Sequence, residues 1–163
     1  MQKLHPKAVW LFFFKFLIGG LFFFIFFSFW LGSFLVQVGG LGYLWGVLLV
    51  FIFFIIFCWI WAKLSWRYYG YQLTEDAFKK EYGVIWKHYI SIPYERIQNV
   101  DIRRGIISRI LGLSELMIQT AGYGAVGARG IGAEGYLPGL DKNTAEQLRE
   151  ELIKRAKGTK QGL

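Results

Sequence analysis

Residues 17–36 (LIGGLFFFIFFSFWLGSFLV) and 41–62 (LGYLWGVLLVFIFFIIFCWIWA) form two apolar runs that lie almost back to back and contain no charged residue. A run of about 20 apolar residues, at the rise of an α-helix, matches the hydrocarbon thickness of a bilayer. Runs of this length are typical of membrane-spanning helices. The sequence therefore predicts an integral membrane protein with two spans.

Basic residues flank the pair of runs, whereas the connector at 37–40 carries no charge. The flanking residues are Lys3, Lys7, Lys15, Lys63 and Arg67. Because Lys and Arg accumulate at the cytoplasmic ends of membrane helices, we expect a helical hairpin in the cytoplasmic membrane with both termini in the cytoplasm. A cleaved signal peptide is a rival interpretation of the first run. A second run follows at once and no small-x-small cleavage site is evident, so we expect the first run to remain.

Four side chains near the ends of the runs are candidate anchors at the membrane interface. Lys15 can extend its ammonium group to the lipid headgroups, and the indole of Trp66 suits the interfacial layer. Lys63 and Arg67 supply positive charge directly after the second run. We expect an anchoring role for Lys15 and not a role in an ion pathway.

The chain after the second run has a different composition, with charged residues of both signs among alternating apolar and polar positions. We divide the chain into residues 1–65, an N-terminal tail with the hairpin, and residues 66–163, which are enough for one small cytosolic domain. Cys58 is the single cysteine and lies inside the second run. One cysteine excludes an intrachain disulfide and a cysteine-based metal site.

Apolar and polar residues alternate with a period of two over four segments of this second part, which predicts short half-buried strands. These segments are residues 68–74, 86–92, 98–103 and 116–120. Turn-forming residues at 74–76 and at Tyr82-Gly83 predict hairpins.

Two stretches have helical character. Residues 106–111 fit one or two turns closed by Gly112, because glycine readily adopts the left-handed conformation that ends a helix. Near the C-terminus, Asn143 with Glu146 three residues later fits a capping box, and we expect Gly158 to end the helix. Its predicted buried stripe consists of Ala145, Leu148, Leu152, Ile153 and Ala156.

Short strands followed by one amphipathic helix suggest a small, bent sheet or open barrel that the last helix plugs. Three ordered segments, IPYERIQNV (92–100), GIISRILGL (105–113) and IQTAG (118–122), resemble the bacterial pleckstrin-homology-like (bacterial PH) domain of the YdbS-like membrane proteins. The two-span hairpin fits that layout as well. The resemblance implies an α+β fold, a split β-barrel of about seven strands with a C-terminal α-helix, and it implies little about activity. The chain departs from the family in its Gly-rich stretch after Gly122.

A formal GxGxxG motif occurs at residues 122–127. A dinucleotide site needs the last glycine to open a helix within a βαβ unit. Further glycines follow up to Gly135, and these oppose a helix. We therefore interpret residues 122–135 as a long hairpin loop and expect no bound nucleotide.

No catalytic or cofactor motif is evident in the sequence. His5 and His88 are the only histidines, and no HExxH, GxSxG or CxxC pattern occurs. We expect no enzyme activity, no catalytic residue, no cofactor and no metal. Nucleic-acid binding is also not expected, because no groove-reading helix is apparent.

The net charge of +8 is the remaining functional signal. Arg103, Arg104 and Arg109 surround the short helical turn and are candidates for contact with a protein partner or with anionic lipid. We expect a membrane-anchored interaction or assembly module that binds a protein partner or its own copies. A sensor of anionic headgroups and a small accessory subunit of a transport or export system are the alternatives. The lipid interpretation needs basic side chains that face the bilayer, whereas the scaffold interpretation needs an exposed apolar groove or sheet edge.

Overall fold

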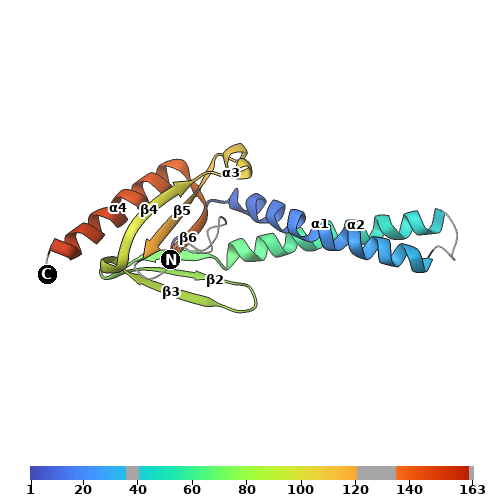
Figure 1. Cartoon of the computed structure of the whole chain (residues 1–163), viewed down its shortest axis with the longest axis horizontal. Helices are drawn as coiled ribbons and strands as arrows, with labels where there is room; N and C mark the ends of the chain where they lie inside the picture. Colours follow the sequence, from blue (N-terminus) through green and yellow to red (C-terminus); the bar gives the residue numbers. More distant parts are fainter. Residues whose placement is uncertain (36–40, 121–134, 162–163) are drawn as a thin grey trace.

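The computed structural model describes residues 1–35, 41–120 and 135–161. Two long helices form a hairpin at one end of an elongated molecule, and a small α+β domain forms the other end (Figure 1). Both ends of the chain lie on the side of the domain (Figure 1). The α+β class with two apolar N-terminal helices is thus confirmed.

The hairpin consists of α1 (Ala8–Leu35) and α2 (Leu41–Arg67). Both helices are long and apolar enough to cross a membrane, and few of their side chains are buried by protein. Gly20 lets the helices approach, since a Cβ at this position would lie 2.7 Å from the ring of Phe54. The predicted connector at 37–40 lies outside the described residues.

The helices extend beyond the predicted runs, because α1 begins at Ala8 and α2 continues to Arg67. The first turns of α1 do not belong only to the hairpin. Ala8, Leu11 and Phe12 are buried in the same apolar cluster as the strands. The N-terminal residues therefore contribute to the domain core across the predicted boundary at 65/66.

Six strands form two antiparallel sheets in the described part of the chain. The first sheet has the order β1 (Gly70–Leu73), β2 (Ala77–Tyr82), β3 (His88–Pro93), and the second has the order β4 (Ile97–Arg103), β5 (Leu113–Thr120), β6 (Gly135–Asp141). The register pairs Phe78 with Leu73 and Ile92 in the first sheet, and Val100 with Ile118 in the second. The alternating apolar residues thereby meet on the inner faces.

The expectation of a barrel of about seven strands was wrong for the described residues, which contain six strands in two separate sheets. Pro93 ends β3, and the short 3-10 helix η2 (Tyr94–Arg96) turns the chain so that β4 pairs with β5 and not with β3. Helix α4 (Lys142–Gln161) then packs against β4 and η2. The helix therefore covers β4 and the segment that links the two sheets.

The ends of α4 differ from the prediction. The backbone N–H of Asn143 donates to the carboxylate of Asp141, so Asp141 and not Asn143 caps the helix. Gly158 does not end the helix, which continues to Gln161, because Gly158 keeps a negative φ. The predicted buried stripe is correct for Ala145, Leu148, Leu152 and Ala156, which belong to the core, and Ile153 is partly buried against it.

The turns agree better with the sequence-based predictions than the ends of α4 do. Gly112 has a φ of +72° and ends α3 (Ile106–Ile110), as predicted. Gly83, with a φ of +113°, opens the turn between β2 and β3. The predicted strand at 86–92 begins later, at His88, so Trp86 lies in this turn and is exposed.

The N-terminal segment is fastened to the domain by backbone hydrogen bonds. Gln2 and Tyr71 exchange two such bonds, and the N–H of His5 donates to Gly139. Gly139 has a φ of +68°, and a side chain there would overlap Ala8. The indole N–H of Trp66 donates to the carbonyl groups of Leu4 and His5 at 3.2 Å each. The hairpin and the domain are thus joined at both α1 and α2.

Candidate functional site

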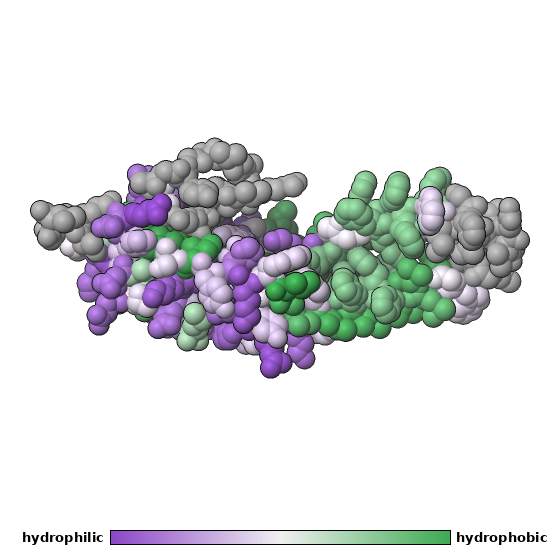
Figure 2. All heavy atoms as spheres, turned by 90° about the horizontal axis from the view of Figure 1, so that it is seen from below, coloured by the Kyte–Doolittle hydropathy of each residue, from purple (hydrophilic) through white to green (hydrophobic). Residues whose placement is uncertain are grey.

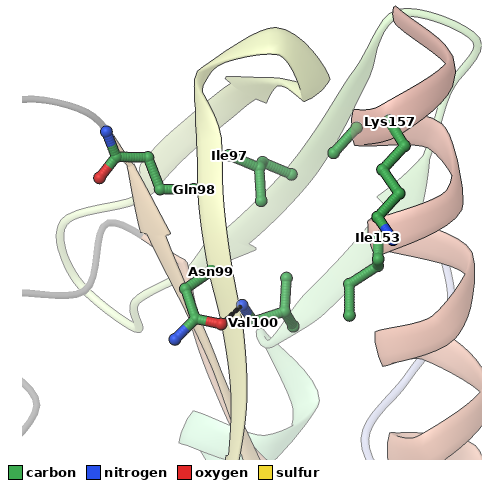
Figure 3. A pocket seen from close by; sticks show the side chains of 7 residues that line it. Ile97, Gln98, Asn99, Val100, Ile153 and Lys157 are labelled. Carbon is green, nitrogen blue, oxygen red and sulfur yellow. Dashed lines mark hydrogen bonds between the residues drawn. The ribbon is translucent and has the colours of Figure 1, made fainter. Parts of the chain in front are cut away.

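A groove lies between strand β4 and helix α4, and Figure 3 shows it from close by. Its volume is about 290 Å³. Four lining residues come from β4 and three from α4: Ile97, Gln98, Asn99, Val100, Ile153, Ala156 and Lys157. None of the seven is a histidine, cysteine or carboxylate, so the groove offers binding contacts and not acid–base groups.

The walls of the groove are apolar. Ile97 and Val100 point toward α4, whereas Gln98 and Asn99 point away from it (Figure 3). Ile153 lies on the facing wall on α4 (Figure 3), Ala156 also lines the groove, and the exposed Lys157 lies at its rim. The groove therefore combines a small apolar interior with a positive charge at its edge.

Strand β4 can border a groove because it is an edge strand, paired with β5 alone in the described part of the sheet. A bulge places Gln98 opposite no partner, since the register shifts between Ile97 and Asn99. Bulges bend a strand and interrupt its ladder. This bend positions Ile97 and Val100 beside the last turns of α4.

The backbone groups of Val100, where β4 lines the groove, already have hydrogen-bond partners. The N–H of Val100 donates to the side-chain oxygen of Asn99 at 2.9 Å, and its carbonyl accepts from Arg149 Nε at 3.1 Å. Exposed strand edges attract other chains, and occupied backbone groups reduce this tendency. A ligand of the groove would therefore gain more from apolar burial than from strand pairing at Val100.

Arg155 fixes α4 against the rest of the domain. Its guanidinium donates to Glu151 at 2.6 Å and to the carbonyl of Thr74 at 2.8 Å, and it lies over the ring of Tyr94. The hydrogen bond from Arg155 lowers the pKa of Glu151, whereas burial raises the pKa of Tyr94. The helix that forms one wall of the groove is thus held to the turn between β1 and β2 and to η2.

The three predicted contact arginines lie far along the chain from α4, around α3. Arg103 is the last residue of β4, Arg104 follows it and donates to the carbonyl of Leu113 at 3.2 Å, and Arg109 lies in the last turn of α3. All three are exposed. None of these three arginines lines the groove. The sequence patterns therefore did not predict this site.

The predicted interface anchors have mixed surroundings. Lys15 and Lys63 are exposed on α1 and α2. Trp66 is half-buried and holds the N-terminal segment, and the carbonyl of Arg67 accepts from Lys3 Nζ at 2.7 Å. Trp66 and Arg67 therefore have a structural contact that the sequence did not reveal. Their anchoring role stays a prediction.

The predicted Gly-rich loop and its GxGxxG motif lie outside the described residues, apart from Gly135 at the start of β6. His88 is exposed and stacks on Tyr82, with ring centroids 5.1 Å apart. Among the described residues, no group of three or more His, Cys, Asp or Glu could hold a metal ion.

Comparison with known proteins gives one family and one curated relative. The bacterial PH domain family matches residues 22–156. The UPF0699 transmembrane protein YdbT of Bacillus subtilis (strain 168) is 33% identical over 105 residues, which cover 62% of this chain and 20% of YdbT. The chain thus spans about a fifth of the length of this relative. No solved structure matches the chain.

Proposed function

The chain belongs to the bacterial PH domain family, and we propose that it is a membrane-anchored, non-catalytic interaction module whose groove between β4 and α4 binds a protein partner. The resemblance noted in the sequence is confirmed by the family match and by the similarity to YdbT. The observation that supports the proposal is an open apolar groove at an edge strand.

The open shape of the groove, more than its size, favours a peptide segment over a small molecule. Pockets for small molecules occupy about 300–1,000 Å³ and enclose most of the ligand. The groove has about 290 Å³ and is bordered by only one strand and one helix. Such a space suits one or two apolar side chains of a partner segment. Lys157 at the rim favours an acidic residue beside them.

The position of the groove also supports binding of a partner outside the membrane. Its α4 residues belong to the C-terminal half of the helix, which extends away from the hairpin (Figure 1). A partner in the groove would not compete with lipid. The partner could be another protein or a second copy of this chain. The basic flanks of the hairpin support a cytoplasmic position of the domain.

A photocrosslinking amino acid at Ile153 or Lys157 tests the groove in the full chain in its native membrane. We expect crosslinked adducts at both positions and few at Lys154, which is exposed on the same helix but does not line the groove. The mass of the adduct distinguishes a second copy from another protein. Equal crosslinking at Lys154 would contradict the proposal.

Charge reversal provides a second test. Lys157→Glu should weaken binding of an acidic partner segment, whereas Lys154→Glu, with the same change in net charge, should not. Exposed charge pairs contribute about 0.2–1 kcal/mol, so a loss of affinity of up to roughly fivefold is expected. Identical effects of both variants would indicate that long-range charge and not the groove determines binding.

A further inference from the structure

The short helix α3 exposes apolar side chains. Ile106 and Ile110 are 78% and 79% exposed, and their spacing of four residues places them on one face of the helix. The opposite face is held inward, because the hydroxyl of the buried Ser108 donates to Glu115 at 2.6 Å. Two isoleucines thus point outward while a serine points into the protein, which is the reverse of a helix that packs on a soluble core.

The turn between β2 and β3 also exposes large apolar side chains. Ile85 and Trp86 are 65% and 77% exposed. Gly83 allows this turn, because a side chain there would overlap the backbone of Trp86. Large apolar side chains at the tip of a hairpin gain nothing from contact with water.

Both exposed tips lie at the end of the domain from which the hairpin emerges. Helix α3 lies near α1, and in Figure 1 α3 and the β2–β3 turn extend along the long axis to the first turns of the hairpin, on opposite sides of it. Figure 2 shows strongly hydrophobic spheres at the border between the hairpin and the hydrophilic domain. The two tips therefore continue the surface of the membrane-spanning helices.

Basic residues accompany the apolar tips. Arg103 and Arg109 are exposed beside Ile106 and Ile110, and Lys87 follows Trp86. Glu81, the acidic residue near the turn, already contacts Lys87 at 3.5 Å. Apolar side chains flanked by Lys and Arg are the composition of segments that lie in the interface of anionic bilayers.

We propose that α3 and the β2–β3 turn insert into the interfacial layer of the bilayer beside the hairpin and form two further membrane contacts of the domain. Ile106, Ile110, Ile85 and Trp86 enter the boundary between headgroups and acyl chains, and Arg103 and Arg109 contact anionic headgroups. Continuity with the membrane-spanning helices identifies the bilayer as the ligand. The inference rests on membrane insertion of the hairpin and is independent of the groove.

Spin labels in the full chain, reconstituted into liposomes with anionic lipid, test the insertion. Single cysteines replace Ile110 or Trp86 in a Cys58→Ala background, with Phe26→Cys as a reference inside the membrane and Lys154→Cys, exposed outside the groove, as a reference in water. We expect the labels at Ile110→Cys and Trp86→Cys to be more accessible to oxygen than to a water-soluble nickel chelate, as for a depth of about 5–10 Å in the bilayer. Nickel accessibility equal to that at Lys154→Cys would overturn the proposal. Broadening of the spin-label spectrum that increases with the protein-to-lipid ratio would also overturn the proposal, because a second copy would then cover the tips.

A charge variant tests the role of the arginines. In liposomes with anionic lipid, replacing Arg103 and Arg109 by Ser should make the label at Trp86→Cys more accessible to nickel. The matched control replaces Lys154 and Lys157 by Ser, which removes the same charge at the distant helix α4 and should leave the label unchanged. Equal changes in both variants would overturn the assignment of headgroup contact to α3. The label at Phe26→Cys reports in every sample whether the hairpin is inserted.

Discussion

Tyr69 and Tyr136 illustrate how single side chains stabilise the junction between the two sheets. The hydroxyl of the buried Tyr69 donates to the backbone carbonyl of Tyr136, and the hydroxyl of Tyr136 donates to Glu115 at 3.1 Å. Burial raises the pKa of both phenols, and the negative charge of Glu115 raises that of Tyr136 further. Glu115 also accepts from Ser108, so one carboxylate connects β5, β6 and α3.

We predict that these tyrosines make the domain sensitive to alkali. Their pKa in the folded state lies above the ordinary value of about 10, so stability is fully present below pH 10 and decreases as the pH rises above it. Thermal unfolding in detergent between pH 8 and 11 should show this decrease. Tyr69→Phe should cost about 1 kcal/mol at neutral pH, for one lost hydrogen bond, and reduce the alkaline decrease. An unchanged alkaline decrease in this variant would contradict the assignment to Tyr69.

Residue patterns predicted buried positions better than they predicted the ends of elements. The stripe with Leu148 and Leu152 is buried as its spacing indicated. The capping box at Asn143 was wrong because Asp141, two residues earlier, offers an equally good acceptor, and only the path of β6 decides between them. Trp86 was assigned to a strand because its neighbours alternate in polarity, although the five residues between β2 and β3 form a turn.

At the level of elements, the sequence indicated most strands but not which of them share a sheet. Alternation shows that β4 has an apolar face, yet only the topology makes β4 an edge strand beside α4. The groove depends on this order and on the bulge at Gln98, so no local pattern could reveal it. The contribution of the N-terminal segment to the core was missed for the same reason, because Leu4 precedes its partners in the chain by more than sixty residues.

We predict that Trp66 holds this segment in place. Trp66→Phe keeps an aromatic side chain, although a smaller one, and removes the N–H that donates to Leu4 and His5, whose loss should cost about 1 kcal/mol. Amide hydrogen exchange at Gln2 and His5 should become faster, because their bonds to Tyr71 and Gly139 open more often. Trp86→Phe, in the exposed turn, serves as the control. Unchanged exchange at Gln2 and His5 would mean that the segment is held by other contacts.

For the whole molecule, the arrangement places the N-terminal segment and the domain on the same side of the hairpin (Figure 1). The basic flanks predict that this side is cytoplasmic. In a Cys58→Ala background, a cysteine at Val38 should react with an impermeant reagent added to intact cells. A cysteine at Lys157 should react only after the cells are opened. Reaction at Lys157 in sealed cells would reverse the predicted orientation.

Only two residues separate the end of α2 at Arg67 from the start of β1 at Gly70, and the N-terminal segment joins the same domain a second time. These two attachments prevent the domain from rotating relative to the hairpin. Membrane helices change their tilt when bilayer thickness changes. The domain must then tilt together with the hairpin as one rigid body. Bilayer thickness would therefore determine the distance between the end of α4 and the lipid surface.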